Sequence, residues 1–414
     1  MKKMINLVSL FDSRENCCGC GSCMNICPKN AIFMKEDKLG FRYPVIEPEK
    51  CIGCKKCVTA CAYQVHNPEE NHQLIAAYGV MSKNNELTRL SASSGVFAEL
   101  AKLVLDNKGI VYGCSMEFCN GTPVVKHIEV SSIKMLPKLQ GSKYVSSDTG
   151  LIYRSVKENL KSGKTVLFSG TPCQVDALKS FLKNERTDNL ITVDIICHGV
   201  PSNKMFSDYI NLLSNKLGGQ ITDFRFRDKS VDWGVKGSVY FVNRRGVKKK
   251  KPIIAQLSSY YKLFLDGVIC RDSCYKCKYA NKNRTGDLTL GDYWGFDKVH
   301  PEQLTDNDGN FSIEKNISCV LVNTPKGKDC FSMIKNNFFL CNTTFENIAE
   351  FNHQLMFPLE GGKLRKHLLK IYSIQGYAEV DKYYEKKIGL KKYVFEFWNA
   401  IPLSFRKRLK QIKK

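Results

Sequence analysis

The chain has 414 residues, which is long enough to bury a substantial core in more than one domain. Its 63 Lys and Arg against 40 Asp and Glu give a net charge of +23, but no nucleic-acid recognition motif accompanies that charge, so no nucleic-acid partner is expected. No run of eighteen apolar residues exists, which excludes a membrane-spanning helix, and the first ten residues lack the apolar region of a signal peptide. We therefore expect a cytoplasmic protein, in which nineteen cysteines point to metal ligation rather than to disulfides.

Two cysteine runs near the N-terminus share one spacing. Each reads C-x2-C-x2-C-x3-C, and the first is followed directly by Pro28. This is the pattern of bacterial ferredoxins with two [4Fe-4S] clusters, in which the fourth cysteine of each run ligates the other run's cluster. The first cluster is accordingly assigned to Cys17, Cys20, Cys23 and Cys61, and the second to Cys51, Cys54, Cys57 and Cys27.

Zinc and disulfides are the alternatives for these thiols. Zinc can use C-x2-C pairs, but it needs only four ligands and does not explain two complete runs with Cys-Pro. Disulfides need an oxidising compartment. We therefore expect a ferredoxin domain over residues 8–66, of the α+β ferredoxin-like class. Cys18 lies outside the repeated spacing and is interpreted as a spare loop thiol.

A polar segment over residues 67–75 is interpreted as a linker, and after it strands and helices alternate. Strands are predicted over 76–80, 110–114, 124–130, 165–168 and 189–197. Helices are predicted over 95–106, 149–160, 174–182, 203–217 and 257–267. Residues 221–245 indicate a more irregular β region. The alternation predicts an α/β domain over residues 76–345 with a mainly parallel sheet.

A second group of cysteines lies in this α/β region. Cys173 follows a strand and opens a helix, whose N-terminus favours a thiolate. Cys197 ends the next strand, so both thiols lie at strand carboxyl ends, where α/β sheets place their sites. Cys270, Cys274 and Cys277 follow with a C-x3-C-x2-C spacing, which taken alone could also be half of a zinc site.

At these cysteines the chain resembles the family of coenzyme F-420 hydrogenase/dehydrogenase beta subunits. The matching stretches are Ser91–Gly95, Gly141–Ser146, Phe168–Gln174, Cys197–Ser202, Ser273–Lys278 and Gly286–Gly295. With the fused ferredoxin unit, the resemblance covers about residues 10–300. It implies a [4Fe-4S] cluster beside a flavin, and electron transfer between iron–sulfur centres and a flavin or deazaflavin. Bacterial members with this fused ferredoxin are often associated with surface-polysaccharide genes, and the family also includes reductases of chlorophyll intermediates.

The resemblance also implies the ligands of a third cluster. These are Cys173, Cys197, Cys274 and Cys277, with Cys270 as the competing ligand. The other five cysteines stand in apolar or loop contexts and are expected to be buried or spare thiols, namely Cys114, Cys119, Cys319, Cys330 and Cys341.

A flavin adenine dinucleotide needs backbone donors at its pyrophosphate and a charge or donor near its ring. The candidate binding residues are Ser93, Ser94, Gly95, Gly141, Ser142, Lys143, Tyr144, Gly170, Thr171 and Pro172. Ser93 and Ser94 precede a predicted helix, and an ordinary N-cap is the alternative for them. Lys143 and His198 are the candidate catalytic residues, against the simpler interpretations of a solvated lysine and a histidine hydrogen-bonded near the cluster. Asp292 and Trp294 are expected either to line the flavin site or to pack in the core at the end of a strand.

Residues 346–414 are expected to form a basic helical C-terminal region. Its last part, residues 381–414, holds eleven Lys and Arg against three Asp and Glu, with aromatic residues between them. This composition is typical of an amphipathic segment that contacts a membrane peripherally at its inner face, or of a surface helix packed on the body. Pro402 is expected to divide it into two short helices. Residues 244–251 form a second cationic patch, expected as a hairpin that docks an acidic electron carrier or is simply solvated.

Together these features predict an iron–sulfur flavoprotein oxidoreductase. Electrons would enter at the ferredoxin unit from a redox partner protein, and a small-molecule or glycan-linked substrate would be reduced at FAD. A non-catalytic polyferredoxin, acting as the electron-relay component of a larger complex, is the main alternative. A binding module with structural metal is the third.

Overall fold

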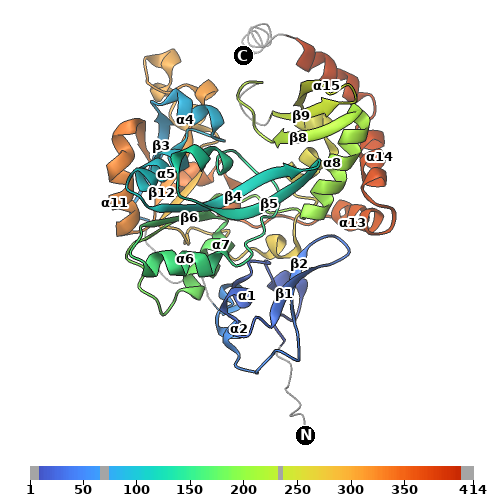
Figure 1. The fold of residues 1–414 in the computed structure, drawn as a ribbon. Coiled ribbons are helices and arrows are strands. Elements are labelled where there is room, and N and C mark those ends of the chain that lie inside the picture. Colours follow the sequence, from blue (N-terminus) through green and yellow to red (C-terminus); the bar gives the residue numbers. More distant parts are fainter. Residues whose placement is uncertain (1–8, 66–73, 232–235, 402–414) are drawn as a thin grey trace.

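The computed structural model describes residues 9–65, 74–231 and 236–401. In Figure 1 a small N-terminal unit, drawn in blue, lies beneath a central sheet, and the C-terminal helices, drawn in red, lie at one side of that sheet. The predicted linker over 67–75 and the predicted bend at Pro402 fall mostly or wholly outside the described residues. None of the described helices is both long and apolar enough to cross a membrane.

The N-terminal unit consists of short elements placed between the cysteines. Its helices are α1 (Ser22–Ile26), α2 (Lys56–Thr59) and α3 (Ala62–Val65), and its strands are β1 (Ile32–Glu36) and β2 (Arg42–Ile46). The two strands pair antiparallel, with Ile32 opposite Ile46. Gly21 precedes α1 with a φ of 77°, a conformation that glycine adopts without steric cost and that turns the cysteine loop into the helix.

The central sheet has eight strands in the order β13-β3-β12-β11-β7-β6-β4-β5. They are β3 (Ala76–Ser82), β4 (Ile110–Cys119), β5 (Thr122–Val130), β6 (Val166–Gly170), β7 (Leu190–Ile195), β11 (Leu288–Asp292), β12 (Ser318–Val322) and β13 (Phe338–Thr343). The neighbours β4, β6, β7 and β11 run parallel. Antiparallel pairs attach β5 on one side and β12, β3 and β13 on the other. The parallel sheet expected from the sequence is thus the central block of a mixed sheet.

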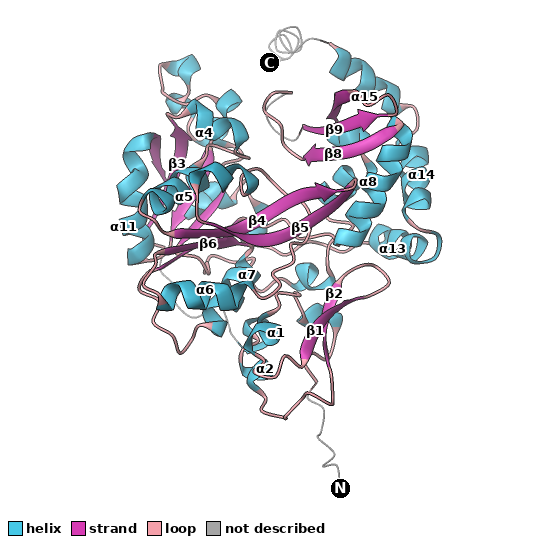
Figure 2. Ribbon diagram, viewed as in Figure 1, coloured by secondary structure: helices cyan, strands magenta, loops and turns pink. Residues whose placement is uncertain are grey.

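Helices cover both faces of this sheet (Figure 2). On one face lie α5 (Val96–Asp106) and α11 (Pro325–Ile334), and on the other lie α6 (Ile152–Lys161) and α7 (Pro172–Phe181). Alternation along β4 explains the two cores, because Val111 packs with α5 whereas Tyr112 packs with α6. The shorter helices of this part are α4 (Asn85–Leu90), α10 (Phe296–Val299) and α12 (Phe345–Ala349).

A second, three-stranded antiparallel sheet has the order β10-β9-β8. Its strands are β8 (Gly219–Arg225), β9 (Gly237–Asn243) and β10 (Lys248–Ile253). The irregular β region expected over 221–245 contains the paired strands β8 and β9, with a register shift between Ile221 and Asp223, and the expected basic hairpin is β9–β10. An aromatic core joins this sheet to α8 (Asn203–Leu217) and α9 (Ser259–Leu265).

The C-terminal region is helical as far as it is described. It contains α13 (Lys363–Gln375), α14 (Tyr377–Ile388) and α15 (Lys391–Ala400). Tyr377, Val380 and Tyr384 of α14 are buried in the aromatic core. Asp381 accepts hydrogen bonds from Lys216 at 2.5 Å and from Ser259 at 2.6 Å, which ties α14 to α8 and α9.

Candidate functional site

The first set of thiols is brought together by the N-terminal unit. Cys17 and Cys20 lie on the loop into α1, Cys23 lies in the first turn of that helix, and Cys61 lies between α2 and α3. Burial raises the pKa of Cys17 to about 11, with Cys20 and Cys61 adding to the rise and Arg271 opposing it. Burial also raises the pKa of Cys23, and the nearby thiols of Cys20, Cys17 and Cys61 contribute. These four side chains therefore form one mutually interacting set, and they are the residues assigned to the first cluster.

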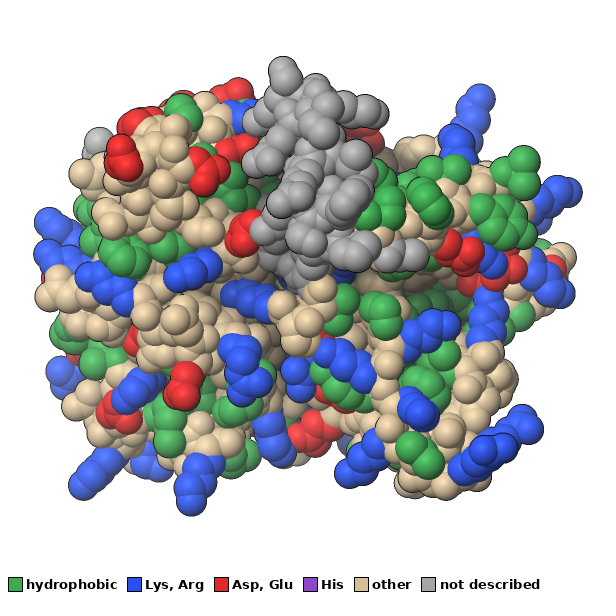
Figure 3. Space-filling model, turned by 90° about the horizontal axis from the view of Figure 1, so that it is seen from above, with side chains coloured by type: hydrophobic (Ala, Val, Ile, Leu, Met, Phe, Trp, Pro, Cys, Tyr) green, Lys and Arg blue, Asp and Glu red, His purple; other side chains and the backbone are tan. Residues whose placement is uncertain are grey.

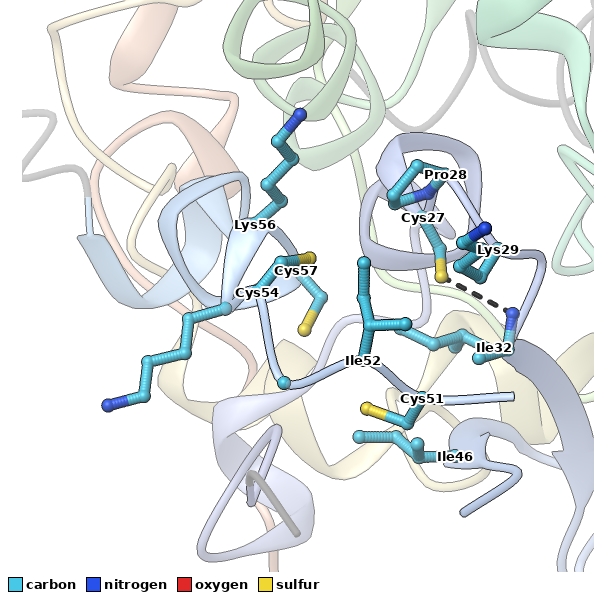
Figure 4. Close-up of a pocket in the computed structure, with 13 residues that line it drawn as sticks. Cys27, Pro28, Lys29, Ile32, Ile46, Cys51, Ile52, Cys54, Lys56 and Cys57 are labelled. Carbon is cyan, nitrogen blue, oxygen red and sulfur yellow. Dashed lines mark hydrogen bonds between the residues drawn. The ribbon is translucent and has the colours of Figure 1, made fainter. Parts of the chain in front are cut away.

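The second set lines a pocket of the N-terminal unit (Figure 4). Cys27, Cys51, Cys54 and Cys57 all border it, with the aliphatic side chains of Ile32, Ile46 and Ile52 around them. The backbone N–H of Ala31 donates a hydrogen bond to Cys27 Sγ at 3.3 Å. Such N–H donors stabilise the sulfur ligands of an iron–sulfur cluster. The crossed assignment of Cys27 to the second run thus agrees with the pocket that the chain forms.

The third set lies at the carboxyl edge of the parallel block. Cys173 occupies the first turn of α7 after β6, and Cys197 follows the end of β7. Cys274 and Cys277 come from the short 3-10 turn Asp272–Lys276 and its end. Burial raises the pKa of Cys274 to about 12 and that of Cys277 to about 11, and in each case neighbouring thiols of the set add to the rise. Each of the four thiols interacts with the other three.

Cys270, the competing ligand, has a different environment. Its side chain is fully buried and belongs to the aromatic core. Its thiol interacts with Cys274 and Cys197, and a Cβ at Gly199 would lie 3.0 Å from its sulfur. The remaining cysteines lie elsewhere: Cys319, Cys330 and Cys341 are buried in the sheet cores, Cys114 is half-buried and Cys119 is exposed. The geometry therefore favours the four-thiol set without Cys270.

The donor chemistry of all three sets suits four-iron clusters. Each set offers four thiols, which is the ligand number and type that a [4Fe-4S] cluster requires. Within the described residues, no group of three or more His, Cys, Asp or Glu side chains is arranged to hold a single metal ion.

Cys18 connects the first set to the third. Its thiol hydrogen-bonds to Cys20 on one side and to Cys173 on the other. These bonds lower the pKa of Cys20 and of Cys173, and they raise the pKa of Cys18, which remains the proton donor. The expected spare loop thiol is thus a direct connection between the two sets. The cysteine spacing held no sign of this role, because the contact depends on tertiary packing.

Arg271 also lies between these two sets, although sequence reasoning did not single it out. It is 2% exposed, and its Nη1 and Nη2 donate hydrogen bonds to Cys17 O at 3.0 Å and Arg42 O at 2.6 Å. Its guanidinium stacks over the Tyr43 ring at 4.5 Å. Its positive charge favours the thiolates of Cys17, Cys173 and Cys274. Nε is buried without a hydrogen-bond partner in the described chain, so a donor remains available at this position.

Further hydrogen bonds hold the N-terminal unit against the α/β body. Tyr153 and Thr149 donate to Cys20 O at 3.0 and 2.9 Å. Tyr63 donates to Ser273 O and Lys276 O, in the turn that carries Cys274. The loop of the first thiol set is therefore held against the body, and Arg154 of the body also donates to Cys27 O of the second set at 2.9 Å.

Two of the candidate flavin-binding loops lie side by side. Gln140 Nε2 donates to Leu87 O and Ser91 Oγ, both at 3.0 Å, which joins the Gly141–Tyr144 loop to the loop before α5. Lys229 donates to Ser93 O at 2.5 Å and Thr88 O at 2.8 Å, and burial lowers its pKa to about 8. The hydroxyls of Ser93 and Ser94 are buried with no hydrogen-bond partner among the described residues. Unpaired buried hydroxyls and a nearby cation suit a phosphate-bearing ligand.

An ion pair stands next to these loops. Arg227 pairs with Asp292, and its guanidinium lies 5.8 Å from the centre of the Trp294 ring. Its charge also influences the hydroxyls of Tyr144 and Tyr261. Sequence reasoning singled out Asp292, Trp294 and Tyr144 but missed Arg227 and Lys229, which come from the chain just after β8.

Other candidate residues have partners that define their surroundings. Thr171 Oγ1 lies 3.2 Å from Cys173 Sγ, so Gly170–Pro172 borders the third thiol set. Lys143 is partly buried, donates to Gln140 O at 2.7 Å and Lys138 O at 3.2 Å, and burial lowers its pKa to about 8. His198 has both ring nitrogens engaged, with Leu265 O at 2.9 Å and Gln354 Nε2 at 2.8 Å. A catalytic role for His198 would require one of these contacts to break.

These features define an electron-transfer protein of the iron–sulfur oxidoreductase type. Residues 16–65 match the 4Fe-4S dicluster domain, and residues 163–346 match the C terminus of the coenzyme F420 hydrogenase/dehydrogenase beta subunit. The chain thus joins a ferredoxin domain to a region that matches the family of F420 hydrogenase/dehydrogenase beta subunits, which confirms the resemblance.

Relatives match different shares of the chain. A component of the F(420)H(2) dehydrogenase of Methanosarcina mazei is 23% identical over 273 residues, which is 63% of this chain and 71% of that protein. A component of the Na(+)-translocating ferredoxin:NAD(+) oxidoreductase complex of Acetobacterium woodii is 34% identical over 83 residues, which is 20% of this chain and only 23% of that protein. A solved structure of the F420-reducing [NiFe] hydrogenase complex of Methanosarcina barkeri superposes with a TM-score of 0.42 at 15% identity, covering 77% of this chain and 94% of that one.

Proposed function

We propose that the protein is an iron–sulfur flavoprotein oxidoreductase that takes electrons from a redox partner protein and delivers them to a substrate at a flavin. The twelve cysteines of the three sets would hold three [4Fe-4S] clusters, and the loops around Ser93 and Tyr144 would hold FAD. When bound, the clusters supply one-electron transfer and the flavin links it to two-electron chemistry. The observation that carries the proposal is the hydrogen-bonded thiol of Cys18 between Cys20 and Cys173.

The positions of the three thiol sets support one order of electron transfer between them. The pocket of the second set is lined by residues of the N-terminal unit alone, which makes it the proposed entry point for a partner. Tyr153, Thr149 and Arg271 fix the loop of the first set against the body through its backbone carbonyls. The third set lies at the carboxyl edge of the sheet. This arrangement supports an electron route from the second set through the first to the third.

The flavin loops offer charges suited to an anionic cofactor. Lys229 holds the carbonyls of Thr88 and Ser93 and places a cation beside the free hydroxyls of Ser93 and Ser94. Arg227 adds a second cation, which forms an ion pair with Asp292 and lies over the Trp294 ring. A negatively charged reduced flavin and its pyrophosphate are both stabilised by such groups.

The substrate class follows from the sequence resemblance alone: a small molecule or a glycan-linked compound of surface-polysaccharide metabolism, reduced in the cytoplasm. Relatives named as components of redox complexes support a protein partner as the electron donor. They equally support the alternative of a relay protein without catalysis. The hydroxyls of Ser93 and Ser94, which have no hydrogen-bond partner among the described residues, disfavour that alternative because a relay protein does not need a flavin-binding site.

The test is reduction of bound flavin in the anaerobically purified protein. Reduced external ferredoxin should bleach the flavin absorbance of the wild type, and Cys277→Ser should slow that bleaching at least about tenfold, because the third set lies on the route. Protein that carries clusters but no flavin would support the relay alternative. Bleaching of Cys277→Ser at the wild-type rate would show that the third set is not on the route.

A further inference from the structure

Helix α15 presents an apolar stripe to solvent. Its exposed hydrophobic side chains are spaced three and four residues apart, which places them on one face of a helix. Their exposed fractions run from 36% to 82%. They are Tyr393, Val394, Phe397 and Trp398, together with Leu390 directly before the helix. We call this set the α15 stripe. Contiguous apolar side chains of this kind rarely face water in a soluble protein unless they bind something.

The rest of the helix shows which side faces the protein. Phe395 and Asn399 are half-buried and lie one turn apart, and Asn399 Nδ2 donates to Phe395 O at 2.7 Å. At 100° per residue these two positions are opposite the middle of the α15 stripe. The helix contacts the 3-10 turn Ala255–Leu257, which directly follows β10. The helix therefore packs on the body with its less apolar side and turns the stripe outward.

Positive charges surround the stripe. Lys386, Lys387, Lys391 and Lys392 are exposed around the start of α15, and none of them forms an ion pair within the described residues. Strand β10, next to the turn that α15 contacts, adds the exposed residues Lys248–Lys251. Figure 3 looks onto the end of the molecule that carries α15 in Figure 1, and it shows hydrophobic side chains next to Lys and Arg side chains on this face. The sequence after the helix, residues 402–414, contains six Lys and Arg and no Asp or Glu.

We propose that the α15 stripe and its surrounding lysines bind an anionic lipid surface, with α15 lying in the plane of the interface. An interfacial helix combines Trp, Phe and Leu on one face with Lys and Arg around it. An acidic protein would satisfy the lysines but offers no general reason for five outward apolar side chains. A lipid surface satisfies both, because the aromatic rings enter the headgroup region while the lysines meet the anionic headgroups. The proposal is independent of the redox proposal above.

The test uses flotation of the full-length protein with vesicles. Wild-type protein should float with vesicles of phosphatidylcholine and phosphatidylglycerol at low salt, should be released at high salt, and should stay unbound with phosphatidylcholine alone. Val394→Glu combined with Phe397→Glu should lower the bound fraction roughly tenfold by placing two charges in the apolar face. Lys391→Glu combined with Lys392→Glu should weaken binding and reduce its salt dependence.

Met333→Glu is the matched control. Met333 on α11 is 69% exposed, against 71% for Phe397, so both substitutions place a carboxylate at a similarly exposed position. Met333→Glu should float like the wild type. The proposal is overturned if wild-type protein fails to float at low salt, or if the α15 variant floats as well as the wild type. Self-association or capture of an acidic redox protein that depends on Phe397, without vesicle binding, would also overturn it. Ferredoxin-dependent flavin reduction in solution should be unchanged in all these variants, which separates this outcome from that of the redox proposal.

Discussion

Arg271 donates a hydrogen bond of 3.0 Å to the backbone carbonyl of Cys17, although the two residues are 254 positions apart in the chain. The donor lies directly after Cys270, on the loop that carries Cys274 and Cys277 of the third thiol set, and the acceptor begins the first set. One side chain therefore joins the N-terminal unit to the α/β body next to cysteines of both thiol sets. A Cβ at Gly19 would lie 2.5 Å from Nη2 of the same arginine, so the loop of the first set leaves room for it.

Replacing Arg271 by Met should lower the reduction potentials of the first and third clusters. Reduction adds negative charge, and the variant removes a buried positive charge that interacts with Cys17, Cys173 and Cys274. A unit charge near a buried centre shifts its potential by tens of millivolts, on the order of 1–2 kcal/mol. Potentiometric titration followed by electron paramagnetic resonance measures the shift, with Arg271→Lys expected to recover most of it.

Arg154 provides the matched control for docking. Its guanidinium also holds backbone carbonyls of the N-terminal unit, those of Asn25 at 2.7 Å and Cys27 at 2.9 Å. Arg154→Met should loosen the docking in the same way but should leave the third cluster's potential unchanged. Equal shifts of the third cluster in both variants would mean that Arg271 acts through docking alone.

The ligands of the third cluster are distinguished by two serine variants. Cys274→Ser should lose about four irons per chain, because one [4Fe-4S] cluster goes with its ligand. Cys270→Ser should keep the wild-type iron content, since Cys270 packs in the aromatic core outside the four-thiol set. Iron and acid-labile sulfide analysis of both variants shows which of the two cysteines is a ligand of the third cluster. Loss of iron in Cys270→Ser with wild-type iron in Cys274→Ser would reverse the assignment.

Lys229 should matter for holding the flavin. Lys229→Met removes the two hydrogen bonds that fix the loop of Ser93 and removes a cation beside it, so flavin content after gel filtration should fall several-fold. Lys326→Met is the control, because Lys326 also donates to two backbone carbonyls, those of Thr187 and Leu190, away from the candidate cradle. A similar flavin loss in both variants would point to general instability rather than to the cradle.

Acid should destabilise the protein through His127. Burial lowers its pKa to about 4, with Lys143 adding to that effect and Ser169 O and Asp148 opposing it. The folded-state pKa lies below the unfolded value of about 6.5, so the unfolded chain takes up the proton first as pH falls, and the unfolding free energy drops by about 2 kcal/mol between pH 7 and 5. His127→Gln should flatten this part of the pH profile of thermal unfolding. His367→Gln, at an exposed position, should leave the profile as in the wild type.

Local patterns predicted the cysteine chemistry and most of the elements. The spacing of the two runs fixes which thiols one loop can gather, and the expected helix over 203–217 is observed with the same ends in α8. The antiparallel strands around the parallel block were not foreseen, because pairing depends on where distant strands pack. Cys18, Arg271, Arg227 and Lys229 were missed for the same reason: each acquires its role from a tertiary contact that leaves no local signal in the sequence.

The most direct test of the account is the cofactor content of the protein purified without oxygen. Iron, acid-labile sulfide and flavin should be quantified on one sample of intact, folded chain. We predict about twelve irons, about twelve sulfides and about one flavin per chain, as three [4Fe-4S] clusters and one bound flavin require. About eight irons with no flavin, in protein whose α/β body is folded, would contradict both the third cluster and the flavin site.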